Sequence, residues 1–309
     1  MFKIEAGARE GHEAYKVLAE KLVRRFKGVT VRKGSHGVIR VSCGGRVSHR
    51  LVFIPPAFPL PRGEKKVKGT VPPIGPSVAP IKPRKGKTVK VALVIDDIGN
   101  DRAIAKKLLD LPIPITLSIF PFAPYSREIA KEALAKRHVI LMHLPMEPIG
   151  YPGKGKDPGP GALYVRMSPE EIKKQLNADL DRIPEVSGIN NHMGSRFTCD
   201  SEGMRAVMVV LKQRKKIFLD SRTIAGSVGY ETAKEVGIPT ARRDVFLDNT
   251  RDVATIRRQL DHLVAIAKKR GTAIGIGHPH RATYLALKKA IPEYLKEGVE
   301  FVYITSLVH

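Results

Sequence analysis

The sequence predicts an α/β fold in which about seven parallel strands form a β/α barrel, preceded by a small αβββ module. From Val89 onward, short apolar runs alternate with amphipathic helical segments. Upstream, residues 55–83 contain nine prolines, and residues 1–54 combine one helical stripe with three β-branched runs. We therefore expect three parts: the αβββ module over residues 1–54, a Pro/Lys-rich linker over 55–88 and the barrel over 89–309.

The N-terminal module is predicted from two patterns. Apolar residues spaced between Tyr15 and Phe26 give a helical stripe over residues 8–28 that ends at Gly28. Three short β-branched runs separated by glycine-containing turns then predict strands: VTVRKG, HGVIRVSC and RVSHRLVFI. A module of this size buries little apolar surface, so we expect it to dock on another surface. The proline-rich segment that follows is expected to be extended, because proline fixes φ and removes a backbone donor.

The barrel is predicted from apolar strand-like runs that alternate with helices. The runs, in chain order, are VKVALVIDD, PITLSIF, HVILMHL, SGINNHM, KIFLDSR, VFLD, TAIGIGH and EFVYITSL. A helix is expected to open at Ser126, and another at Ser168, where Ser-Pro-Glu-Glu forms a capping box. A long helix is expected from Thr250 to Gly271. Seven or eight such units in about 220 residues favour a barrel over an open sheet.

The positive charge is concentrated in the first 90 residues. The net charge is +24, and residues 1–54 carry 12 basic against 4 acidic side chains, while residues 55–90 carry 9 against 1. Such a flank can concentrate a protein on an anionic envelope surface, although a solvated, self-repelling linker has the same composition. A nucleic-acid partner is not expected, because the basic segments lack interleaved aromatic residues.

No run of the chain approaches the ~20 apolar residues of a membrane span, and the first residues lack the apolar core of a signal peptide. We therefore expect neither feature in the printed sequence. The two cysteines, Cys43 and Cys199, do not form a disulfide framework.

Polar side chains follow most of the predicted strands, where the mouth of a barrel would lie. They are Asp96 and Asp97; His143 with Glu147; Asn190, Asn191 and His192; Asp220 and Arg222; Asp248; and His278 and His280. Taken singly, the acid pair could cap the next helix, and each histidine could be structural. Together they offer a carboxylate and two or three imidazoles, the ligands that suit zinc or a similar divalent ion.

The order of these motifs resembles the divergent branch of the polysaccharide deacetylases, within carbohydrate esterase family four. VIDDIG resembles the family's first motif, which implies that Asp96 is the catalytic base and Asp97 a metal ligand. HVILMHLPME resembles the second motif and implies that His143 is a ligand, while GINNHMGSRFT places His192 where it could complete the set.

Two further motifs complete the resemblance. IGIGHPH resembles the last motif, with His278 as the catalytic acid, and FLDSRT occupies the place of the motif whose aspartate orients that acid, here Asp220. The resemblance covers about 220 residues and implies a distorted β/α barrel.

The chain departs from the family pattern at two points. Glu147 stands where the second motif has another ligand histidine, and no arginine-proline-tyrosine motif is evident, which leaves Arg196 or Arg222 for its charge. We expect five residues at the mouth to contact substrate: Asn191, Arg196, Arg222, Glu147 and His280.

The resemblance implies a metal-dependent hydrolase that removes N-acetyl or O-acetyl groups from a polysaccharide or cell-envelope glycan, with zinc as the expected ion and the periplasm or envelope as the expected compartment. The alternative is a catalytically weakened carbohydrate- or envelope-binding protein that retains the barrel. Paired acids with histidine also serve metal phosphohydrolases, but no glycine-rich phosphate loop supports that reading.

Overall fold

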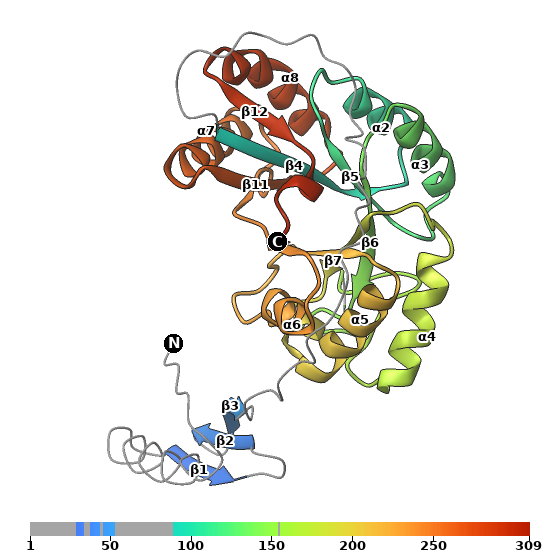
Figure 1. The fold of residues 1–309 in the computed structure, drawn as a ribbon, viewed down its shortest axis with the longest axis vertical. Helices are drawn as coiled ribbons and strands as arrows, with labels where there is room; N and C mark the ends of the chain where they lie inside the picture. The colour runs from blue at the N-terminus through green and yellow to red at the C-terminus, as the bar shows by residue number, and fades with distance from the viewer. Residues whose placement is uncertain (1–28, 34–37, 44–45, 53–88, 154) are drawn as a thin grey trace, which may run out of the picture. The chain divides into compact units, whose positions relative to one another are not determined.

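The computed structural model describes residues 29–33, 38–43, 46–52, 89–153 and 155–309 (Figure 1). The chain divides into two compact units, residues 1–71 and 72–309. That division falls inside the stretch predicted as a linker, and the boundaries at 54 and 88 stay predictions. The helix expected over residues 8–28 and the linker itself lie outside the described residues. Within the described part, no helix is both long and apolar enough to cross a bilayer.

The first unit contains a three-stranded antiparallel sheet in the order β1-β2-β3. Its strands are β1 (Val29–Lys33), β2 (Val38–Cys43) and β3 (Arg46–Val52). The three strands predicted for this module are therefore confirmed.

The second unit is built on a curled parallel sheet whose strand order is β10-β11-β4-β5-β6-β7-β8-β9, with β12 also paired to β4. Its strands are β4 (Val89–Ile98), β5 (Thr116–Ile119), β6 (Ile140–Met146), β7 (Gly188–Met193), β8 (Ile217–Asp220), β9 (Thr240–Arg242), β10 (Val245–Phe246), β11 (Thr272–Gly277) and β12 (Val299–Val302). No pairing joins β9 to β10 among the described strands, so the sheet is a half-barrel. The predicted distorted β/α barrel is confirmed.

The sheet has nine strands, against the seven or so predicted from eight apolar runs. The run VFLD contains β10, which is only two residues long, whereas β9 was missed because it has three residues and contains an arginine. The run EFVYITSL is a strand only as far as Val302, and residues Ile304–Ser306 form a 3₁₀ turn.

Helices pack on the outer side of the curl (Figure 1). They are α2 (Arg102–Leu109), α3 (Ser126–Ala135), α4 (Pro169–Leu180), α5 (Ser201–Gln213), α6 (Gly229–Val236), α7 (Val253–Arg270) and α8 (Arg281–Lys296). The capping box at Ser168 is present, and Gly271 ends α7 with a φ of 93°. The expected start of α7 at Thr250 is wrong, because Asp252 is the N-cap residue and accepts a hydrogen bond from the Thr255 N–H.

Two apolar cores follow from the alternation of side chains along each strand. Val91, Leu93 and Ile95 of β4 pack against the helices, whereas Ala92 and Val94 face the interior of the curl. All the strands of this sheet run parallel, so their carboxyl ends meet at one edge, as in other β/α barrels.

Candidate metal centre and active site

Strand alternation decides which polar residues reach the interior of the curl. Val94 and Ile276 belong to the inner core, so Asp96 and His278, two residues further along β4 and after β11, continue on the same face. The residues are 182 positions apart in sequence and are brought together because β4 and β11 are neighbours in register.

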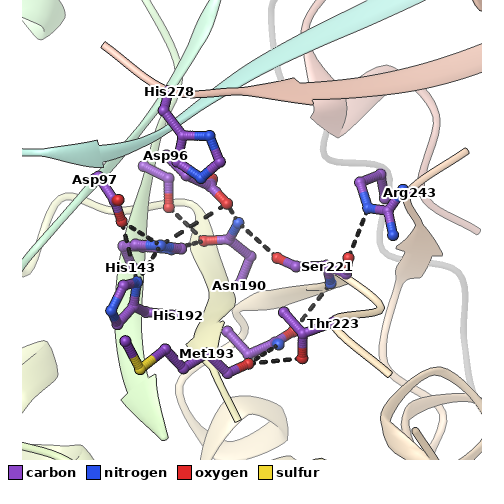
Figure 2. Close-up of polar contacts among 12 residues, drawn as sticks. Asp96, Asp97, His143, Asn190, His192, Met193, Ser221, Thr223, Arg243 and His278 are labelled. Carbon is purple, nitrogen blue, oxygen red and sulfur yellow. Dashed lines mark hydrogen bonds and ion pairs between the residues drawn. The ribbon is translucent and has the colours of Figure 1, made fainter. Parts of the chain in front are cut away.

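Three side chains converge beside Asp96 (Figure 2). The Asp97 Oδ1 atom lies 3.1 Å from His143 Nε2 and 3.0 Å from His192 Nδ1, and the two nitrogens are 3.2 Å apart. Ligand atoms about 2.0–2.1 Å from one tetrahedral zinc ion are separated by roughly 3.3–3.4 Å, slightly more than the distances here. The predicted ligand set is thus assembled close to the spacing of one ion's coordination sphere.

Local backbone geometry aims these three side chains. His143 lies opposite Asn190 in the β6–β7 ladder, and His192 lies two residues further along the same face of β7. The β4–β5 register shifts between Ile95 and Ile98, and Asp97 has a φ of 55°. This bulge lets two consecutive acids both reach the mouth, whereas a regular strand would send them to opposite faces.

The chemistry of the donor set fits a divalent ion. Asp97 Oδ1 is buried without a well-aligned hydrogen-bond donor, an unusual state for a carboxylate oxygen. Although burial acts in the opposite direction, the two imidazoles hold the pKa of Asp97 well below its usual range. Burial lowers the pKa of His192, whereas the carboxylates of Asp96 and Asp97 overcome burial and raise the pKa of His143. A bound cation would replace the proton that these groups otherwise share.

Asp96 is buried behind these atoms. Its Oδ1 accepts a hydrogen bond of 2.7 Å from Asn190 Nδ2, and its Oδ2 lies 3.8 Å from His143 Nε2. Burial raises the pKa of Asp96, opposed by the charges of His143 and His278 and by the Asn190 bond. Asp96 does not cap the next helix, since Asp101 fills that role at α2.

His278 is paired with Asp248. Its Nδ1 lies 2.8 Å from Asp248 Oδ1, and its backbone N–H donates to Asp248 Oδ2 at 2.6 Å. Burial would lower the pKa of His278, but the bond and charge of Asp248, assisted by Asp96 and Asp97, raise it to about 9. The imidazole therefore carries a proton at neutral pH.

The predicted pairing of Asp220 with His278 is wrong. Asp220 follows Leu219, an inner-face residue, and so points to the other side of β8. There its carboxylate accepts hydrogen bonds from Ser227 Oγ at 2.7 Å and from the Tyr230 N–H at 3.1 Å, which orders the start of α6. Asp248 was identified from the sequence as a polar residue that follows a strand, but its pairing with His278 was not predicted.

Glu147 is not among the clustered ligand atoms. Its Oε1 accepts from Arg196 Nη1 at 2.6 Å, and its Oε2 accepts from the Val165 N–H at 2.7 Å. Glu147 therefore links the loop after β6 to the segment that follows His192. The Arg196 guanidinium pairs with Glu147 and not with a residue of the ligand cluster.

Two of the other predicted substrate contacts have structural partners. The Asn191 side chain donates to the Met193 carbonyl and accepts from the Ser221 N–H, each at 2.9 Å. Arg222 is exposed, with a φ of 47°, and its N–H donates to Asp220 Oδ1 at 2.8 Å.

His280 lies near His278, with ring centroids 5.9 Å apart and ring planes inclined by 28°. Asp248, His278 and His280 also place potential ligand atoms close together. Here the Asp248 oxygens are already occupied by His278 and by the Thr283 hydroxyl, so internal hydrogen bonds account for the approach of Asp248 to His278.

Two residues near the site carried no recognised sequence signal. The Phe120 ring packs against His143 and His192, with centroids 5.1 and 4.8 Å away. Arg243 donates to the Ser221 carbonyl at 2.7 Å (Figure 2) and to the Arg222 carbonyl at 2.9 Å. Burial, with the nearby charge of Arg222, lowers the pKa of Arg243 to about 10.

A curled parallel sheet with an Asp-His-His cluster, a buried second aspartate and an Asp-paired histidine defines the class of deacetylase-like α/β proteins. Residues 93–308 match the divergent polysaccharide deacetylase family, and the chain belongs to that family.

Three proteins similar to the chain have names that assign no activity. The chain is 36% identical over 220 residues to the uncharacterized protein YibQ of Escherichia coli K12, covering 71% of this chain and 67% of that one. It is 35% identical over 218 residues to an uncharacterized protein of Haemophilus influenzae, covering 71% and 76%. The crystal structure of an uncharacterized protein, ATU2773 of Agrobacterium tumefaciens C58, superposes with a TM-score of 0.69 at 30% identity, covering 73% of this chain and 91% of that one.

Proposed function

We propose that the protein is a metal-dependent hydrolase that removes acetyl groups, N-linked or O-linked, from a polysaccharide or cell-envelope glycan. The observation that carries the proposal is the triangle of Asp97, His143 and His192 atoms, no side of which exceeds 3.2 Å, beside a buried carboxylate. Family membership supports the same reaction class.

Asp97, His143 and His192 would hold the ion, and we propose zinc because the set mixes one carboxylate with two imidazoles. When bound, such an ion supplies a Lewis acid that polarises the acetyl carbonyl and lowers the pKa of water. Phe120, packed on both imidazoles, limits how far the two rings can turn.

Asp96 and His278 divide the proton transfers. Asp96 lies beside the ligand atoms and would accept the proton of the attacking water. His278 is protonated, and Asp248 occupies its Nδ1, so its Nε2 proton is the one available to a leaving amine or alcohol. A raised histidine pKa suits a general acid at neutral pH.

The basic N-terminal residues would bring the enzyme to an anionic envelope surface, and the partner at the mouth would be a carbohydrate. This assignment to the envelope rests on the charge distribution and the family. Arg196, Arg222, Asn191 and His280 remain candidates for contacts with the sugar.

Release of acetate tests the proposal. Purified protein is incubated with N-acetylglucosamine oligomers and with a chromogenic acetyl ester, with and without a chelator, and zinc is restored afterwards. We expect chelator-sensitive turnover that zinc restores, lost in Asp96→Asn with zinc still bound and retained in the control Asp181→Asn, whose exposed side chain pairs with Arg214. Tight glycan binding with no turnover would support the binding-protein alternative instead.

The role of His278 as the general acid is tested by a separate substitution. His278→Ala should impair amide substrates at least tenfold more than the activated ester, whose leaving group needs little protonation. Equal losses on both substrates would contradict the acid role.

A further inference from the structure

We propose that Asn190 is a positioning residue whose single amide couples the base Asp96 to the metal ligand His143; this inference rests on the proposed function. Asn190 is fully buried on the inner face of β7, directly opposite His143 in the β6–β7 ladder. Figure 2 shows it between Asp96, His143 and Ser221.

Both the NH₂ group and the oxygen of the Asn190 side chain have two partners each. Its Nδ2 donates to Asp96 Oδ1 at 2.7 Å and to Ser221 Oγ at 3.0 Å. Its Oδ1 accepts from the Ser118 hydroxyl and faces His143 Nδ1 at 2.9 Å. An amide with four partners cannot turn without breaking several bonds at once.

The orientation of this amide follows from the carboxylate. An ionised Asp96 can only accept hydrogen bonds, so the NH₂ group of Asn190 must face it. The carbonyl oxygen is then left facing His143. Reversing the amide would place its oxygen against the carboxylate of Asp96 and its NH₂ against His143.

The orientation of the amide in turn determines the state of the imidazole. Because Asn190 Oδ1 is an acceptor, His143 Nδ1 must carry a proton, and the lone pair of neutral His143 is then on Nε2. This is the nitrogen that faces Asp97 and His192. Outer partners of this kind orient metal-binding histidines, and their loss typically costs 10–100-fold in metal affinity or activity. The side-chain amide of Asn190 thus orients His143 Nε2 as a metal ligand and positions the carboxylate of Asp96 beside it.

Two substitutions separate the halves of the amide. Asn190→Asp keeps an acceptor for His143 and Ser118 but replaces the donor to Asp96 with an oxygen. Asn190→Leu, similar in volume, removes both. Asn177→Leu is the matched control, because Asn177 lies on α4, where its partners are the Lys173 carbonyl and Arg214. Zinc affinity is measured by chelator competition, kcat and KM on the acetyl ester at saturating zinc, and folding by thermal melting.

We expect Asn190→Asp to bind zinc within about threefold of the wild type, with kcat at least tenfold lower and KM little changed. Asn190→Leu should lose 10–100-fold in zinc affinity as well as in kcat. Wild-type zinc affinity in Asn190→Leu, or equal losses of zinc affinity in both variants, would overturn the proposal. If Asn190→Leu does not fold, Asn190→Ala provides the same comparison. The zinc affinities do not require turnover, so a wild type without deacetylase activity would refute the proposed function and leave this test intact.

Discussion

Replacing Asp248 with asparagine tests how the fold keeps His278 protonated. The carboxylate accepts from the ring and backbone of His278, and the pair is little exposed, at 27% for the histidine and 0% for the aspartate side chain. The pKa of His278 is raised from 6.5 to about 9. At 1.36 kcal/mol per pKa unit, this corresponds to about 3 kcal/mol in favour of the imidazolium.

Asp248→Asn removes the negative charge beside His278 and leaves at most a neutral amide oxygen as acceptor, so burial is opposed mainly by Asp96 and Asp97 and the pKa of His278 should fall by about two units. The group's folded pKa lies above its unfolded value. Its contribution to stability is therefore complete below about pH 6.5 and is lost as the pH rises through about 9. The variant should be less stable than the wild type mainly at and below neutral pH.

The assay is an NMR titration of isotope-labelled histidine rings, with His278 assigned through His278→Gln, and it needs no substrate. Asp261→Asn is the control, because Asp261 binds Arg257 and Tyr294 elsewhere in the unit. A His278 pKa in Asp248→Asn within half a unit of the wild type would refute the reasoning and leave Asp96 and Asp97 as the cause.

Three further outcomes are expected. His143→Ala should lose stoichiometric zinc and turnover together, as measured by metal analysis of the folded protein. A chain beginning at Thr88 should fold and retain zinc, with weaker, less salt-dependent binding to anionic vesicles; if it is insoluble, the N-terminal part belongs to the barrel core. Burial raises the pKa of Asp179 to about 7, and its Oδ2 has no hydrogen-bond partner. Because the pKa of Asp179 is higher in the folded than in the unfolded state, the free energy of unfolding should fall as the pH rises from about 4 to 7, by at most about 4 kcal/mol. The melting temperature of Asp179→Asn relative to the wild type should therefore increase over that range, and a constant difference would contradict this.

The sequence predicted which residues lie at strand ends but not which face of the sheet they occupy. Strands buried on both faces read as continuous apolar runs, so alternation cannot be assigned from the sequence. Asp220 and Asp248 both follow such runs. Only the structure shows that Asp220 points towards α6 while Asp248 reaches His278.

Asp97 and His192 were predicted correctly as neighbours of His143 through the motif resemblance rather than through periodicity. The positive φ of Asp97 breaks the alternation that periodicity assumes. The fourfold bonding of Asn190 depends on register between β6 and β7, which no local pattern specifies. The start of α7 was misplaced because Thr250 and Asp252 are both suitable N-cap residues, and in the structure Asp252 accepts the capping hydrogen bond.

The central claim is that Asp97, His143 and His192 bind one divalent ion. Anomalous diffraction at the zinc absorption edge, from crystals of zinc-loaded protein, tests it most directly. We predict one strong peak among Asp97 Oδ1, His143 Nε2 and His192 Nδ1. A peak only at Asp248 and His280, or no peak in protein saturated with zinc, would contradict the account.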